Sequence, residues 1–143
     1  LDVSACTRLM GCAELGETLS VSPGIEMDLT IRFRDPIAPN NYGDDPSVRR
    51  VDLILGEVGG PGTDADSDRN PTARVVARFG SEDWVQDGEY YTTETTVSVG
   101  AGDLFLRVRG TGTEDAEPLM DQPGENPWAD LWFYSSPIFV DVK

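Results

Sequence analysis

Oxygen-bearing side chains alternate in one short acidic segment of the sequence, residues 64–70. Asp64, Asp66, Asp68 and Asn70 occupy every second position of this segment. Calcium takes roughly six to eight oxygen ligands, and a D-x-D-x-D-x-N loop can supply several of them. We therefore name these four residues as a candidate calcium site.

The match to a calcium loop is incomplete at two positions. Arg69 stands where the sharp turn of such a loop requires glycine, and Val75 stands where a bidentate glutamate would complete the ligand set. The alternative is a solvated acidic loop that binds no ion. The sequence therefore predicts no cofactor, with calcium as the alternative.

Histidine does not occur in the 143 residues. This removes the usual general base and the commonest neutral metal ligand together. Loop carboxylates such as Asp44 and Asp45 could line a cation or sugar site, but nothing in the sequence fixes the separation that glycoside hydrolysis requires. We therefore expect this chain alone not to be an enzyme.

The chain is strongly acidic, with 26 Asp and Glu residues against 11 Lys and Arg and a net charge of −15. Such a surface repels phosphates and anionic lipids, so we expect neither a nucleic acid nor a membrane partner. No apolar run approaches the ~20 residues of a membrane span. The length fits one domain, residues 1–143, and the start at Leu1 suggests a mature or excised fragment.

Cys6 and Cys12 are the only cysteines and have five residues between them. Two cysteines without histidine leave a tetrahedral zinc site half empty. A small disulfide loop in an exported or periplasmic protein fits this pair, and two unpaired thiols are the alternative.

Apolar and polar residues alternate along residues 26–34, where Met27, Leu29, Ile31 and Phe33 share one face. A period of two predicts a half-buried strand. The same pattern, with its β-branched and aromatic residues, predicts strands at residues 18–21, 26–34, 50–57, 73–79, 89–99, 104–109, 131–134 and 137–142.

Turn-forming residues separate these segments, and Asp87-Gly88 could close a hairpin. The one helical candidate, residues 5–15, is broken by Gly11. Seven or eight short strands predict an all-β, antiparallel two-sheet sandwich, either jelly-roll or immunoglobulin-like. Three long loops interrupt it, at residues 35–48, 59–72 and 110–130, and loops of that length are often functional.

Arginines fall in the middle of the predicted strands, on the side opposite the apolar residues. The six are Arg32, Arg34, Arg74, Arg78, Arg107 and Arg109. Arginine suits interfaces because it is weakly hydrated and holds carboxylates with two bonds. We predict that the sheet carrying Arg107 and Arg109 docks onto another domain. The alternative is cross-strand pairing with Asp28, Asp52, Glu94 or Asp141.

Four blocks of sequence are similar to blocks found in bacterial phosphoesterases of the PHP (polymerase and histidinol phosphatase) type. Residues 51–58 (VDLILGEV) resemble a VDLIxGxV strand, and residues 70–76 (NPTARVV) resemble an NPTAKV segment. Residues 106–111 (LRVRGT) resemble xRxRGT, and residues 130–140 (DLWFYSSPIFV) resemble ADLWFYSNPIFV, with Ser136 in place of asparagine. The resemblance covers residues 51–142.

In that family these blocks follow the metallohydrolase domain, whose metal ligands are mostly histidines and carboxylates. No such histidine can be transferred to this chain. The resemblance therefore implies a non-catalytic C-terminal β-sandwich that packs on, or positions, an N-terminal phosphoesterase domain of the same polypeptide. A carbohydrate- or calcium-binding β-sandwich module is the alternative.

Overall fold

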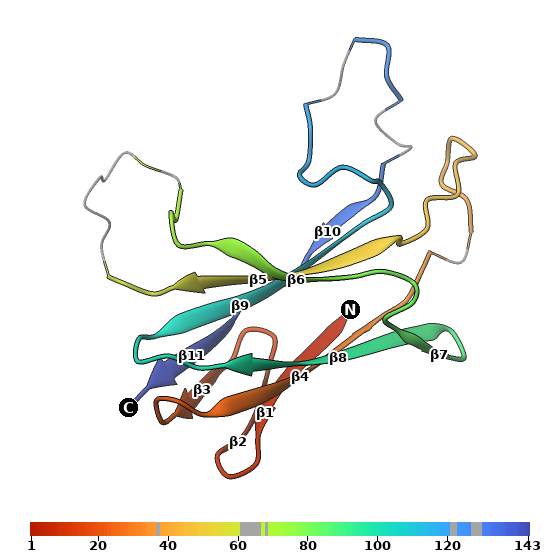
Figure 1. Ribbon diagram of the computed structural model, residues 1–143. Helices are drawn as coiled ribbons and strands as arrows, with labels where there is room; N and C mark the ends of the chain where they lie inside the picture. The colour runs from red at the N-terminus through yellow and green to blue at the C-terminus, as the bar shows by residue number, and fades with distance from the viewer. Residues whose placement is uncertain (37, 61–66, 68, 121–122, 127–129) are drawn as a thin grey trace.

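The computed structural model describes residues 1–36, 38–60, 67, 69–120, 123–126 and 130–143. Within these residues eleven strands form two stacked sheets, and there is no helix (Figure 1). The strands are β1 (Asp2–Thr7), β2 (Gly11–Glu14), β3 (Thr18–Val21), β4 (Glu26–Phe33), β5 (Arg50–Glu57), β6 (Arg74–Phe79), β7 (Val85–Asp87), β8 (Tyr90–Ser98), β9 (Leu104–Thr111), β10 (Trp132–Tyr134) and β11 (Ile138–Val142). The predicted all-β, two-sheet sandwich is confirmed, with more strands than the seven or eight expected.

The first sheet has the strand order β2-β1-β4-β8-β7 and is antiparallel throughout. The second has the order β3-β11-β9-β5-β6, and β10 pairs with β9 beyond the end of β11. Its pairs are antiparallel except β3 with β11, which run parallel. The N-terminal segment therefore contributes to both sheets, since β1 and β2 lie in the first and β3 in the second. No helix in the described residues has the length and apolarity to cross a bilayer.

The core lies between the sheets and follows the alternation seen in the sequence. On β4, Met27, Leu29, Ile31 and Phe33 are at most 2% exposed. They belong to one cluster with residues of the second sheet such as Leu53. Burying a side chain of this size contributes about 1.5–3 kcal/mol relative to leaving it exposed. The polar residues between them face outward.

Every predicted strand is present, with its ends within about two residues of those expected. Three strands are additional. Residues 5–15, the broken helical candidate, form parts of β1 and β2, and the exposed strand β7 also lacks an apolar pattern. Asp87-Gly88 closes a hairpin as predicted, with Asp87 opposite Tyr90 and Gly88 at a φ of 61°.

One register shift changes which residues of β6 face outward. Alternation alone groups Val75 with Ala77 and Phe79 on the apolar side. The pairing of β5 with β6 is irregular between Leu53 and Ile54, so Ala77 lies opposite Leu53 but Val75 lies opposite Ile54. A bulge of this kind inserts an extra residue and reverses the alternation beyond it.

Two of the long loops rise from the same end of the sandwich, the one between β4 and β5 and the one between β9 and β10 (Figure 1). Asn126 donates from Nδ2 to an Asp44 carboxylate oxygen at 3.0 Å and so links them. Asp35 accepts a hydrogen bond from the Val48 amide at 2.6 Å, which ties the first loop across its own base. The described parts of these loops are therefore held by specific polar contacts.

Candidate functional site

Of the predicted calcium ligands, Asp64, Asp66 and Asp68 lie outside the described residues. Asn70 is described, and its Oδ1 accepts from the Thr72 amide at 2.9 Å and from the Thr72 hydroxyl at 2.6 Å. Its Nδ2 donates to the Glu57 carbonyl at 3.0 Å. The Asn70 side chain therefore closes the turn before β6 and ties it to the end of β5. In the part of the chain that the structure describes, no three metal-ligating side chains are grouped so as to hold an ion.

Cys6 and Cys12 are cross-strand partners in the β1–β2 hairpin, and their sulfur atoms are bonded at 2.12 Å. The disulfide encloses the hairpin tip, where Leu9 is 93% exposed. A cross-link between paired strands restricts the unfolded chain and holds the hairpin's register.

Arg109 and Asp52 form a buried ion pair on the outer side of the second sheet. They are cross-strand partners on β9 and β5, and they are 4% and 1% exposed. Arg109 donates from Nε to Asp52 Oδ2 at 2.9 Å. Arg78 adds a longer contact of 3.8 Å to the same carboxylate. A buried charge is tolerated only when it is paired and hydrogen-bonded, as Asp52 is here.

Residues of the loop after β9 cover this pair. Arg109 donates to both carboxylate oxygens of Glu117 and, from Nη2, to the Ala116 carbonyl at 2.7 Å. Arg50 donates from Nε to Asp52 at 3.0 Å and from Nη2 to the Asp115 carbonyl at 2.6 Å. We call Arg50, Asp52, Arg109 and Glu117 the arginine–carboxylate network. It holds residues 114–117 against the sheet.

The network shifts the ionisation of its members. The hydrogen bond with Glu117 raises the pKa of Arg109 still further, and Asp52 adds to the effect against the cost of burial. The hydrogen bond from Arg109 lowers the pKa of Glu117. Glu117 therefore contributes stability above its ordinary pKa, and this is lost as the pH falls through the lowered value. The Glu117 side chain is 63% exposed, so solvent keeps that contribution small.

The two arginines proposed for docking have different surroundings. The buried Arg109 makes the cross-strand pairing with Asp52 that was the alternative, and its remaining guanidinium hydrogen bonds go to Ala116 and Glu117. This argues against a docking role for Arg109. Arg107 is exposed, donates from Nε to the Ser135 carbonyl at 2.8 Å and lies over the Tyr134 ring at 5.4 Å.

Arg107 is surrounded by apolar side chains on the outer side of the second sheet. Register places Ile54 beside Arg107, Phe139 beside Phe105 and Tyr134 beside Arg109, and cross-strand partners share a face. Tyr134 and Phe139 are 46% and 40% exposed. We call Ile54, Phe105, Arg107, Tyr134 and Phe139 the aromatic–arginine face. Aromatic residues and arginine are enriched at protein interfaces, where aspartate, glutamate and lysine are depleted.

Sequence reasoning did not identify Glu117 as part of a site. The alternation of residues 131–134 predicts that Trp132 and Tyr134 share a side, and β10 does place them opposite Thr111 and Arg109. An aspartate inside the apolar run of residues 51–55 was the available signal for a buried ion pair.

The fold and this surface define a two-sheet β-sandwich domain with a buried ion-pair network and an exposed aromatic–arginine face. Comparisons with protein-family models, with curated proteins and with solved structures found no match for the chain.

Proposed function

We propose that the chain is a non-catalytic accessory domain of a PHP-type metal-dependent phosphoesterase, and that it packs against or positions the catalytic domain of the same polypeptide. One observation carries this proposal. The four blocks that resemble that family, though separated along the chain, fall on or beside β5, β6, β9, β10 and β11 of the second sheet. The residues that resemble that family therefore belong to one sheet of the sandwich.

The aromatic–arginine face is the surface we propose for docking, with Arg107 at its centre. Its rings supply apolar area, and Arg107 can hold a carboxylate of the partner with two bonds. Arg107 lies opposite Ile54, and the nearby Asp52 is the register partner of Arg109 and is already neutralised inside the network. The complementary surface on the catalytic domain would be apolar and would carry an acidic group opposite Arg107.

Secretion is part of the same proposal. Cys6 and Cys12 form a disulfide. Disulfides persist in oxidising compartments and are rare in reducing ones. The net charge of −15 disfavours binding to nucleic acid or anionic membranes. We therefore propose an exported or periplasmic enzyme, with its own catalytic domain as the partner of this one.

The test uses the full-length product of the gene, in which a histidine- and aspartate-rich metallohydrolase segment should precede Leu1. Arg107→Ala should loosen domain docking and expose the inter-domain segment to limited proteolysis. In the isolated domain the same change removes one hydrogen bond, to Ser135, and should cost only about 1 kcal/mol of unfolding free energy.

Arg34→Ala is the matched control, since Arg34 is a half-exposed arginine paired with Glu89 at 3.3 Å on the other sheet. It should leave the proteolysis pattern unchanged. A pattern that Arg107→Ala also leaves unchanged, or a gene product without a metallohydrolase segment, would contradict the proposal.

A further inference from the structure

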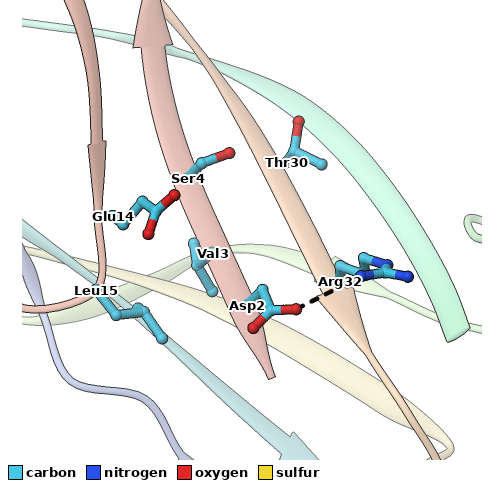
Figure 2. A pocket seen from close by; sticks show the side chains of 7 residues that line it. All are labelled: Asp2, Val3, Ser4, Glu14, Leu15, Thr30 and Arg32. Carbon is cyan, nitrogen blue, oxygen red and sulfur yellow. Dashed lines mark ion pairs between the residues drawn. The ribbon is translucent and has the colours of Figure 1, made fainter.

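The outer face of the first sheet carries a shallow trough lined by hydroxyl and carboxylate groups. One hollow of about 420 Å³ is lined by residues that include Asp2, Ser4, Glu14, Thr30 and Arg32 (Figure 2). A second hollow, of about 380 Å³, adjoins it, because Thr30 lines both. The two together make a surface that crosses the strands and does not run along one of them.

Strand register explains the shape of the trough. Glu14, Ser4, Thr30 and Glu94 are successive cross-strand partners on β2, β1, β4 and β8. Neighbouring strands lie about 4.8 Å apart, so this row spans roughly 14 Å. Short hydroxyl side chains stand in its middle and longer glutamates at its ends, which makes the surface concave.

One side of the trough, next to Thr30, holds a restrained hydrogen-bond donor, Arg32. The Arg32 guanidinium lies 3.5 Å from the centre of the Tyr90 ring and 3.7 Å from the Asp2 carboxylate. Figure 2 shows this ion pair beside Thr30. The contacts restrict the arginine's rotamers, so less conformational entropy is lost when a ligand binds there.

The row of side chains that forms the trough has unused hydrogen-bonding capacity. Among the described residues, the side chains of Ser4, Thr30 and Glu94 have no protein hydrogen-bond partner. Asp28 differs, because it accepts from the Thr96 hydroxyl at 3.1 Å. A row of unused hydroxyls and carboxylates, next to a fixed guanidinium, offers both acceptors and donors to one ligand.

We propose that this trough binds a neutral oligosaccharide lying across the strands from Glu14 to Glu94. A sugar hydroxyl both donates and accepts hydrogen bonds. It can therefore donate to the glutamates, accept from Arg32, and either donate to or accept from the Ser4 and Thr30 hydroxyls. The net charge of −15 disfavours an anionic ligand. A cationic peptide would bring like charge to Arg32 and would make less use of the hydroxyls.

This trough and the aromatic–arginine face lie on opposite outer sides of the sandwich, because they belong to different sheets. Both can be occupied at once. The Cys6–Cys12 disulfide joins β1 and β2 on the same outer face, beside the Ser4–Glu14 end of the trough, and holds these two strands together.

The experiment is titration calorimetry of the purified chain with linear hexasaccharides of β-1,4-linked glucose, xylose or mannose. At least one should bind with a dissociation constant in the micromolar to millimolar range. Thr30→Arg fills the centre of the trough and should weaken that binding by about tenfold or more. Ser98→Arg is the matched control, since Ser98 lies on the same face, beside Glu26 at the end of β8, and should leave binding unchanged.

Circular dichroism checks that each variant folds, and Glu94→Ala at the end of the row is the second variant should Thr30→Arg not fold. It should also weaken binding. Failure of all three sugars to bind at millimolar concentration, or binding that survives both variants, would overturn the proposal. Salt-sensitive binding of hexalysine that Glu94→Ala abolishes, without sugar binding, would replace it with a cationic-peptide site.

Discussion

At the scale of single residues, Asp52 is a buried carboxylate held by three arginines on the outer side of the second sheet. Its carboxylate is 1% exposed and contacts Arg50, Arg78 and Arg109. A buried ion pair is not a large net source of stability, because both charges have lost their hydration. Removing one member is costly, however, since the remaining charge stays buried without a partner.

Asp52→Asn should therefore lower the free energy of unfolding by about 3–5 kcal/mol, measured by urea denaturation. The substitution keeps the shape of the side chain and removes the buried carboxylate, so that Arg109 keeps only the counter-charge of Glu117, whose side chain is 63% exposed. Asp2→Asn removes the carboxylate of an exposed pair, in which the side chains of Arg32 and Asp2 are 43% and 71% exposed, and should cost at most about 1 kcal/mol. Equal, small effects of the two substitutions would show that the network is not buried in solution.

At the scale of elements, periodicity predicted the strands that bury one side against the core. It missed β1, whose buried residues are the small Val3 and Ala5 among polar neighbours, and β7, whose three residues are all exposed. It also could not reveal the bulge that turns Val75 outward, because bulges depend on pairing with β5. The local sequence pattern reports which residues are buried, whereas exposed strands and bulges depend on the strands with which they pair.

The candidate site was predictable to a similar extent. Alternation placed Arg107 and Arg109 on the outer side, and Asp52 was among the expected partners. Which arginine stays exposed depends on the loop after β9, whose carbonyls and Glu117 cover Arg109 but not Arg107. Such a contact between a loop and a sheet leaves no periodic signal in the sequence.

Two glycines of the second sheet each lie beneath an aromatic ring of the neighbouring strand. Gly110 on β9 is the partner of Phe133, and a methyl group at Gly110 would overlap that ring. Gly110→Ala should therefore cost about 1–3 kcal/mol in urea denaturation, since an overpacked core must shift side chains or backbone. Gly100→Ala is the control, because a methyl group there meets nothing within 4 Å. A Gly110→Ala variant as stable as Gly100→Ala would rule out close packing of Phe133.

At the scale of the whole molecule, the two outer faces of a domain with a net charge of −15 differ in chemistry. The first sheet presents hydroxyls and glutamates, and the second presents rings around Arg107. A surface with high net charge resists self-association. Under the two proposals, one side holds the domain on its enzyme while the other holds a sugar chain near it.

This arrangement assigns no chemical step to the chain itself. We therefore predict that the purified chain, supplied with Mg²⁺, Mn²⁺ or Zn²⁺, hydrolyses neither phosphate esters, carboxylic esters nor glycosides above the rate of a mock purification. The reason is the sequence, which contains no histidine to act as a general base or to activate a nucleophile. Chromogenic nitrophenyl substrates provide the measurement. Turnover that survives repurification and is lost in Asp64→Ala or Asp66→Ala would identify a carboxylate-based catalytic site and contradict the accessory role.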